Sequence, residues 1–521
     1  MHHPPLESQS DAVDFLAAPE THGGLPVQRI DTHIGQVFIA GDRAYKLKRA
    51  VEFPYLDFST VALRRQACER ELEINRRTAP EIYLGVAPLV RREDGTLALG
   101  QKETATEPAV VDWVVVMRAF DQDGLFDRLA REGRLTDQLL IALADEIHRF
   151  HDQARAIGRD EPNRGGAAGL CVTVAENGED LALRPDLFDP AHAAALEKRQ
   201  RETIERLKPL LEDRFARGLV RHCHGDLHLR NICLLDGRPR LFDAIEFSEA
   251  MANIDVLYDL AFLLMDLDHR RLRPQANLVM NRYLSRDGAL AGLAALPLFL
   301  SILAAVRAKV SAATEAGQSD PEVCARLREE ARDYFLAALG YLAPTPPSLV
   351  AVGGFSGSGK STLARRLAPS LGAAPGALHL RSDVIRKALF GVDELTRLPP
   401  KAYGSPVSVK VYREMLSRAR EAITAGHAVV VDAVYDRPES RREVEALAGE
   451  LGVSFTGFWL QASPALSLAR AAARRKDASD ATPAVVRQQM SIDPGRITWH
   501  RLDADRRPDR VATQAFGRLF Q

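Results

Sequence analysis

The segment from Gly354 to Ser361, GFSGSGKS, constrains the fold of this chain more than any other part of the sequence. Its glycines allow successive backbone N–H groups to curl around phosphate oxygens at the N-terminus of a helix. Lys360 can then reach the β- and γ-phosphates, and the Ser361 hydroxyl can bind Mg²⁺. An apolar run, Leu349 to Val352, precedes the loop, and a helical stretch begins at Ser361. This order of strand, loop and helix predicts a site for ATP and Mg²⁺. The residues predicted to bind the nucleotide are Gly354, Ser356, Gly357, Ser358, Gly359, Lys360, Ser361 and Thr362.

A proline-rich segment before this loop marks the boundary between two predicted domains. Three prolines within residues 344–347 cannot continue a helix, so we expect an extended linker there. Residues 348–521 contain unbroken apolar runs separated by helical stretches, and buried parallel strands have this pattern. The runs are 349–352, 427–432 and 455–460. We therefore expect the second domain to be an α/β domain with a parallel sheet.

Residues 1–343 show a different order of predicted elements. Strand-like segments come first, at 36–39, 44–47 and 111–117, and long helical stretches dominate after Leu139. Strands followed by helices are typical of an α+β domain. The run 111–117 is rich in β-branched residues, so we expect it to be a central strand.

The composition argues against several classes of protein. Lys and Arg total 69 while Asp and Glu total 70, so no net field attracts nucleic acid or an anionic membrane. The polar N-terminus lacks an apolar stretch of the signal-peptide kind, and the expected location is the cytoplasm. Residues 288–306 are uncharged and long enough to cross a membrane, but Pro297 and many alanines favour a buried helix pair. Nothing in the sequence specifies an oligomeric state.

A second phosphate-handling pattern, HGDLHLRN, lies at His224 to Asn231. Its His-x-Asp-x-x-x-x-Asn spacing is that of a phosphotransferase catalytic loop, in which Asp226 would accept the hydroxyl proton of the substrate. Asn231 would bind the metal ion together with Asp243, which lies 12 residues further on at the end of a predicted strand. This combination predicts a second site for ATP and Mg²⁺.

An ion pair between a strand lysine and a helical glutamate would complete the second site. Lys46 lies in a predicted strand and Glu71 in a predicted helix, and their pairing would hold the lysine on the α- and β-phosphates. Lys48 could replace Lys46, and Glu69 or Glu73 could replace Glu71, because the sequence does not specify the rotation of the helix. A surface salt bridge is the structural alternative.

The residues after the first phosphate loop indicate in which kind of reaction the loop takes part. The segment LRSDVIRK resembles small P-loop kinases of the gluconate kinase, polynucleotide kinase and zeta-toxin group. The resemblance implies that Asp383 takes the proton of the acceptor hydroxyl and that Arg386 binds the acceptor. A carboxylate near the γ-phosphate can orient and deprotonate an alcohol. The structural alternative is a helix N-cap at Asp383 followed by a surface arginine.

Two further features of this part of the chain resemble the same kinases. Arg470, Arg474 and Arg475 lie on a predicted helix and resemble an arginine-rich lid, in which Arg474 would stabilise the charge of the transferring phosphoryl group. Asp432 ends a predicted strand, where it would hold the metal ion or form a structural turn. Arg437 and Arg441 follow it, as in the polynucleotide kinase group.

The earlier pattern resembles the aminoglycoside phosphotransferase and choline kinase branch of protein-kinase-like folds. The resemblance rests on His-Gly-Asp at Asp226, on Phe-Asp at Asp243 and on Asp259, which it implies supports the catalytic loop. A Gly-x-Gly-x-x-Gly loop and an Ala-Pro-Glu segment are missing, which argues against protein substrates. The order of both parts resembles bacterial bifunctional aminoglycoside phosphotransferase-like/ATP-binding proteins.

These patterns together predict a bifunctional kinase that transfers phosphate from ATP to hydroxyl groups of small molecules with Mg²⁺. The alternatives are a regulatory protein that binds ATP without transferring phosphate and a toxin-like kinase. The presence of both bases, Asp226 and Asp383, favours chemistry, because a binding module needs only the phosphate cradle. No motif names either acceptor.

Overall fold

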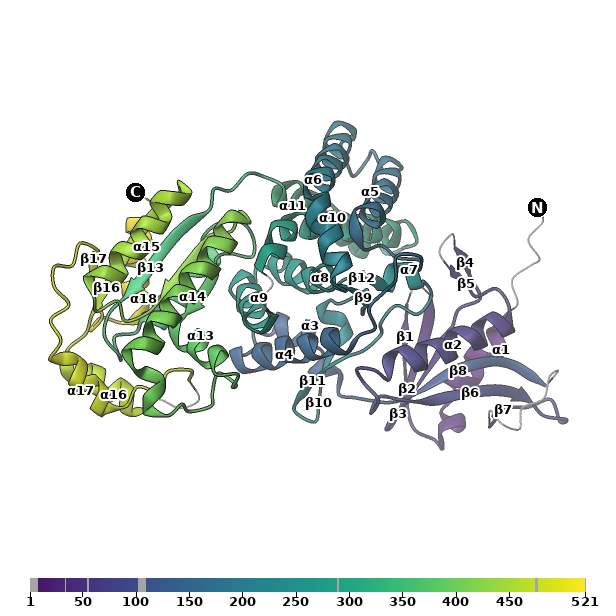
Figure 1. Ribbon diagram of the computed structural model, residues 1–521. Helices are drawn as coiled ribbons and strands as arrows, with labels where there is room; N and C mark the ends of the chain where they lie inside the picture. Colours follow the sequence, from purple (N-terminus) through teal and green to yellow (C-terminus); the bar gives the residue numbers. More distant parts are fainter. Residues whose placement is uncertain are drawn as a thin grey trace. The chain divides into compact units, whose positions relative to one another are not determined.

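The computed structural model describes residues 8–32, 34–53, 56–101, 109–287, 290–473 and 477–520, which form two compact units (Figure 1). Unit 1 consists of the residues up to Asp266 together with Ala305–Tyr334. Unit 2 consists of Leu267–Ala304 together with the residues from Phe335 onward. The predicted linker, 344–347, therefore lies within unit 2, and the limits of the units fall within helices.

Unit 1 begins with a six-stranded antiparallel sheet in the order β1-β2-β3-β8-β6-β7. The strands are β1 (Val27–Asp31), β2 (Gly35–Ala40), β3 (Arg43–Lys48), β6 (Tyr83–Arg91), β7 (Leu97–Leu99) and β8 (Val110–Arg118). The β8 strand pairs with β3 and β6, so the prediction of a central strand there is confirmed. Helix α2 (Val61–Asn75) packs against β8, and Cys68 and Trp113 belong to the shared core.

Helices dominate the rest of unit 1, as expected for a protein-kinase-like α+β fold. They include α4 (Asp137–Gln153), α5 (Gly166–Ala182), α6 (Pro190–Ala216) and α8 (Val256–His269). Two small antiparallel pairs lie among them: β9 (Val220–His222) with β12 (Asn253–Asp255), and β10 (Ile232–Leu235) with β11 (Arg238–Leu241). The segment from β9 to β11 contains the predicted catalytic loop.

Unit 2 contains a five-stranded parallel sheet in the order β14-β15-β13-β16-β17. The strands are β13 (Ser348–Gly353), β14 (Leu378–Arg381), β15 (Val429–Asp432), β16 (Ser454–Gln461) and β17 (His500–Asp503). The predicted parallel sheet is therefore present. The carboxyl ends of parallel strands share one edge, where ligands bind in open α/β folds.

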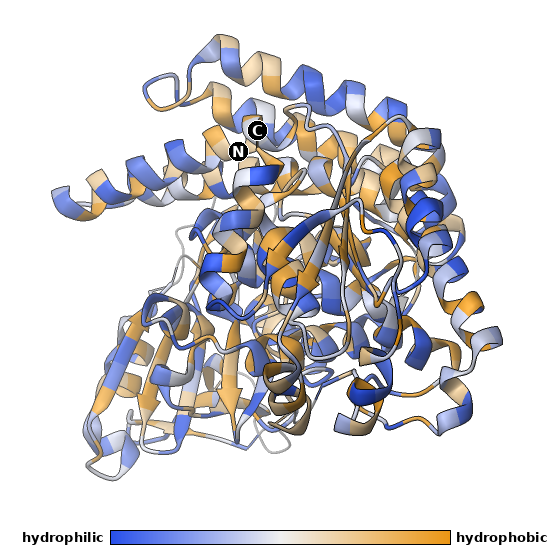
Figure 2. Cartoon of the chain, turned by 90° about the vertical axis from the view of Figure 1, so that its left-hand side faces the viewer, coloured by the Kyte–Doolittle hydropathy of each residue, from blue (hydrophilic) through white to orange (hydrophobic). Residues whose placement is uncertain are grey.

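Helices pack against this sheet and shield its apolar strands from water. Alternate residues of β13 point to opposite faces, and Val350 and Val352 lie in one core with Leu363 and Val511. These two residues belong to α12 (Lys360–Leu367) and α18 (Pro508–Leu519). Helices α14 (Ser405–Thr424) and α15 (Pro438–Leu451) also pack on the sheet and on each other. Hydrophobic and hydrophilic residues alternate along the helices, as expected where one face is buried (Figure 2).

Unit 2 also takes in a helix from before the proline-rich segment, α9 (Arg273–Asp287). The Asn277 side-chain amide donates to the carbonyl of Ala377 at 3.0 Å. The backbone N–H of His379 donates to the Asn281 side-chain oxygen at 2.6 Å. Because β14 is an edge strand, these bonds satisfy backbone groups that the sheet leaves unpaired. The predicted boundary did not include this helix in the second domain.

The long apolar stretch of the sequence forms a short 3₁₀ helix, η4 (Leu290–Ala295), followed by α10 (Leu296–Ala316). Within the described residues it is long and apolar enough to cross a membrane, but 72% of its most apolar window is buried in the protein. It is therefore a core helix of this fold, as predicted.

Candidate active sites

Two lysines of β3 and the predicted glutamate of α2 form the buried centre of the site in unit 1. Lys46 Nζ lies 2.8 Å from Glu71 Oε1 and 2.5 Å from Asp243 Oδ1. Lys48 Nζ lies 2.5 Å from Glu71 Oε2 and also bonds to Glu246. Burial alone would raise the pKa of Glu71, but the two lysines outweigh it and hold that pKa at about 2. Glu71 therefore stays ionised and fixes both ammonium groups.

The structure separates the alternatives that the sequence left open for this pair. Glu69 and Glu73 instead pair with Arg65 and Arg70, away from the lysines. Lys48 is a second partner of Glu71 rather than a substitute for Lys46. The surface-salt-bridge alternative is wrong, because the Glu71 side chain is 0% exposed.

The predicted catalytic loop lies between β9 and β10 and brings Asp226 and Asn231 together. The Asn231 amide donates to Asp226 Oδ2 at 2.9 Å and to the Asp226 carbonyl at 3.0 Å. Burial would raise the pKa of Asp226, but His228, Arg307 and His224 outweigh it and hold that pKa well below its usual range. The carboxylate is 36% exposed, so it is ionised and open to a substrate.

Asp243 follows β11 in the left-handed conformation, with φ 61°, which is uncommon for a non-glycine residue. Its N–H donates to the Tyr83 hydroxyl at 3.0 Å, and the N–H of Ala244 donates to Asn75 Oδ1 at 2.8 Å. The Phe242 N–H donates to the carbonyl of Asn231 at 3.0 Å. These bonds fix the turn that directs the Asp243 carboxylate toward Lys46 and join it to the catalytic loop.

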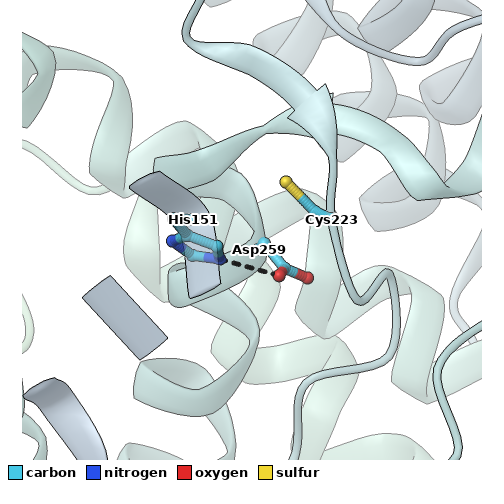
Figure 3. A group of neighbouring side chains, drawn as sticks. All are labelled: His151, Cys223 and Asp259. Atoms are coloured by element: carbon cyan, nitrogen blue, oxygen red, sulfur yellow. Dashed lines mark hydrogen bonds and ion pairs between the residues drawn. The ribbon is translucent and has the colours of Figure 1, made fainter. Parts of the chain in front are cut away.

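His151, Cys223 and Asp259 form a buried group next to the predicted catalytic loop, and Figure 3 shows their side chains. Their potential ligand atoms lie within 4.8 Å of one another. Asp259 is already engaged, because it accepts the N–H groups of His224 at 3.1 Å and Gly225 at 2.9 Å and the His151 ring at 3.0 Å. Burial raises the pKa of Cys223 well above its usual value, so this thiol stays protonated. The group supports the loop, as the resemblance implied for Asp259.

The phosphate loop of unit 2 connects β13 to α12. Gly354 and Gly357 have φ values of 138° and 84° and cannot be replaced without a clash. A Cβ atom would lie 2.7 Å from the carbonyl of Leu460 at Gly354 and 2.5 Å from that of Ser467 at Gly357. The Ser356 N–H donates to the Gln489 side chain at 2.8 Å. The loop is thus held against the elements around it.

Two carboxylates and Lys360 meet at the edge of the sheet where the parallel strands end. Asp432 ends β15, and Asp383 lies in the first turn of α13 (Ser382–Leu389), directly after β14. Burial raises the pKa of Asp383, although Arg381 and Lys360 oppose it. Burial would also raise the pKa of Asp432, but His379 and Lys360 outweigh it and lower that pKa. Both carboxylates line a cleft of about 1370 Å³, which also contains Lys360, Ser361 and Thr362.

Arg386 lines the same cleft, but the protein already holds its guanidinium group. It donates to the carbonyl of Ala402 at 2.7 Å and lies 4.9 Å from the Tyr403 ring centroid. The residue is 7% exposed, and the N-cap position of α13 belongs to Arg381. The alternative of an N-cap aspartate and a surface arginine is therefore wrong.

The predicted lid arginines have different positions. Arg474 and Arg475 lie outside the described residues. Arg470, in α16 (Pro464–Ala473), donates to the carbonyls of Gly357 at 3.4 Å and Ser358 at 3.3 Å. Arg470 therefore binds the phosphate loop itself.

Lys387 and Asp480 form a buried pair beside the cleft to which the sequence patterns assigned no role. The Lys387 ammonium lies 2.9 Å from both carboxylate oxygens of Asp480, and Lys387 is 1% exposed. Asp480 also accepts the Leu398 N–H at 2.9 Å and the Tyr403 hydroxyl at 2.5 Å. It therefore ties α13, the loop before α14 and the segment before α17 (Pro483–Met490) together. The only signal for this role in the sequence is that Asp480 follows closely after the predicted lid arginines.

Comparison with known proteins bears on both units. The family model described as AAA domain matches residues 349–492. This region contains the phosphate loop, Asp383 and Asp432. An uncharacterized protein of Mycobacterium tuberculosis is 29% identical over 491 residues, which are 93% of this chain and 94% of that protein.

Each of two solved structures is similar to only a part of the chain. The APS kinase of Mycobacterium tuberculosis, in complex with AMPPNP and APS, is 21% identical and covers 34% of this chain and 100% of its own, with a TM-score of 0.27. A choline/ethanolamine kinase family protein from Mesorhizobium loti is 15% identical and covers 64% of this chain and 98% of its own, with a TM-score of 0.37.

Proposed function

We propose that the chain is a bifunctional phosphotransferase, which moves the γ-phosphoryl group of ATP to hydroxyl groups of small molecules in both units. One observation carries the proposal: each unit holds a carboxylate and a lysine in the positions that a base and a phosphate-binding cation would need. In unit 1 these are Asp226 and Lys46, and in unit 2 they are Asp383 and Lys360. A protein that only bound ATP would need the lysines and not the bases.

The donors present in both units suit Mg²⁺, a hard cation that prefers oxygen ligands. Asn231 and Asp243 offer amide and carboxylate oxygens in unit 1, and Ser361 and Asp432 offer a hydroxyl and a carboxylate in unit 2. When bound, the ion would neutralise charge on the phosphate oxygens. Lys46 is held for the phosphates of unit 1 by Glu71. Lys48 pairs with the other oxygen of Glu71 and also with Glu246.

The base of each unit takes the proton of the acceptor hydroxyl as its oxygen approaches the γ-phosphorus. Asp226 is ionised and partly exposed, which leaves it open to a substrate. Burial raises the pKa of Asp383, which makes its carboxylate a better proton acceptor.

We expect Asp383→Asn to leave nucleotide binding at unit 2 within about twofold and to lower phosphate transfer there by about 10²- to 10⁴-fold. The reason is that Asp383 contacts the acceptor rather than the nucleotide. Transfer from [γ-³²P]ATP to sugar, aminoglycoside and nucleoside libraries would be measured in an Asp226→Asn background, which silences unit 1. Binding of AMPPNP would be measured on the same protein.

The matched control is Asp393→Asn, which changes a 47% exposed carboxylate outside the cleft and should leave both readouts unchanged. Loss of AMPPNP binding together with transfer would mark Asp383 as a metal ligand instead. A wild-type chain that bound AMPPNP and transferred phosphate to no acceptor would favour the regulatory alternative.

A further inference from the structure

The cleft of unit 2 extends beyond the phosphate loop, and two arginines from different segments of the chain line this extension. Arg413 comes from α14, and Arg437 directly precedes α15. Both are exposed. Neither guanidinium group makes a hydrogen bond or an ion pair with any described residue. They are therefore free to bind a ligand in the cleft.

Contacts between neighbouring residues bring the chain segments that carry these two arginines together. The rings of Tyr412 and Tyr435 meet edge to face with centroids 5.4 Å apart, and the Tyr435 N–H donates to the Tyr412 hydroxyl at 3.0 Å. Arg413 follows Tyr412 directly, and Arg437 lies two residues after Tyr435 in the chain. Tyr435 has φ 53°, an unfavourable conformation for an aromatic residue, and such strain is concentrated at functional sites.

The acidic residues of the cleft are largely committed to other partners. Asp477 pairs with Arg381 at 2.8 Å, Asp480 pairs with Lys387, and Glu439 pairs with Arg442 at 2.8 Å. Asp383 and Asp432 lie at the catalytic end beside Lys360. The remaining acidic residues of the cleft are Asp436 and Glu443. The cleft also contains the unpaired Arg413 and Arg437 and a third arginine, Arg397. The cleft away from the phosphate loop therefore has an excess of free cationic groups.

We propose that the acceptor of unit 2 is a hydroxylated small molecule that carries a carboxylate or a phosphate monoester, bound by Arg413 and Arg437. The proposal rests on the proposed function of unit 2. Both anions match the planar fork of a guanidinium group, which can donate two parallel hydrogen bonds to them. With this group anchored, the hydroxyl oxygen would form a bond to the γ-phosphorus. The bond from that phosphorus to the bridging oxygen breaks, ADP leaves with the electron pair, and Asp383 takes the hydroxyl proton.

The test compares matched acceptors on the full chain in the Asp226→Asn background with Mg²⁺ and ATP. The first series is glycerol, glycerate and glycerol 3-phosphate, and the second is glucose, gluconate and glucose 6-phosphate. We expect kcat/KM to be about 10- to 100-fold higher for at least one anionic member of a series than for the neutral member. A comparison of the carboxylate with the phosphate ester identifies which anion the site takes.

Arg413→Gln and Arg437→Gln should each raise KM for the anionic acceptor by about 10-fold or more and leave the neutral acceptor unchanged. Two controls make the same substitution at arginines outside the cleft. Arg420→Gln lies on the helix that carries Arg413, α14. Arg510→Gln lies on α18, and Arg510, like Arg413 and Arg437, is exposed and unpaired among the described residues. Both should leave KM unchanged. Arg413→Lys should restore only part of the effect on KM for the anionic acceptor, because lysine keeps the positive charge but lacks the planar guanidinium group that donates two parallel hydrogen bonds.

The possible outcomes separate this proposal from the proposed function. Phosphorylation of neutral and anionic members with equal kcat/KM, or an equal loss for both in the arginine variants, would overturn the anion site while unit 2 remained a kinase. If no member is phosphorylated, binding of the same six compounds would be measured by calorimetry with AMPPNP and Mg²⁺ present. Anion-selective binding that Arg413→Gln and Arg437→Gln abolish supports the site, and its absence overturns it.

Discussion

Lys360→Ala is expected to lower phosphate transfer by unit 2 by about 10²- to 10³-fold, because it removes the cation that we propose binds the β- and γ-phosphates as charge moves between them. The same lysine opposes the rise that burial causes in the pKa of Asp383 and helps to lower the pKa of Asp432, so its charge acts on the predicted base and on the predicted metal ligand as well. Initial rates with [γ-³²P]ATP in the Asp226→Asn background would measure the effect.

Lys401→Ala provides a matched control for this substitution, since it removes an exposed lysine of unit 2 that does not line the cleft. Circular dichroism would show that both variants are folded. A folded Lys360→Ala protein with wild-type transfer would refute the phosphate-loop assignment.

Asp226→Asn is expected to lower transfer by unit 1 by about 10²- to 10⁴-fold, in a background where Asp383→Asn silences unit 2. The asparagine can still accept the hydrogen bond from Asn231, so the loop should keep its structure. It cannot accept the substrate proton at neutral pH. Nucleotide affinity should stay within about twofold of that of the background protein, because the proposed role of Asp226 is toward the acceptor and not the nucleotide.

Asp236→Asn is the control for unit 1. It changes a 69% exposed aspartate in the turn between β10 and β11, where φ is 50° and asparagine is well tolerated. Equal losses of transfer in both variants would show that the effect comes from the fold of the β10–β11 hairpin. Undiminished transfer by Asp226→Asn would exclude Asp226 as the base.

Local sequence patterns predicted the features that depend on the spacing of residues along the chain. The glycines, Lys360 and Ser361 function as a contiguous loop, so their order in the chain is enough to predict the loop between β13 and α12. The β-branched run at 111–117 similarly predicted the central strand β8. Asp383 was predicted from the resemblance of LRSDVIRK to small P-loop kinases, and the structure places it directly after β14, at the carboxyl edge of the sheet.

Contacts between distant segments could not be predicted in the same way. Lys46 and Lys48 stayed alternatives because the sequence does not specify how the helix of Glu71 is rotated, and only the packing of α2 showed that Glu71 meets both. Glu246 was missed because it is 198 residues from its partner Lys48. Nothing in the pattern around Arg386 indicated that Ala402 and Tyr403 hold its guanidinium group.

The same limitation affected the predicted boundary. Three prolines mark a break in the chain, but they carry no information about α9, which reaches β14 through Asn277 and Asn281. A fragment that began at Ser348 would lack this helix and leave backbone groups of an edge strand unsatisfied. Experiments on unit 2 therefore use the full chain.

The central claim is that the chain has two separate ATP sites, one in each unit. Calorimetry of the full chain with AMPPNP and Mg²⁺ tests it most directly, because stoichiometry does not depend on either acceptor. We expect a stoichiometry near two, which should fall to about one when Lys360→Ala weakens the site of unit 2. It should also fall to about one when Asp243→Ala removes the predicted metal ligand of unit 1. A wild-type stoichiometry of one that Lys360→Ala abolishes and Asp243→Ala leaves unchanged would contradict the account, since unit 1 would then be a kinase fold without a working nucleotide site.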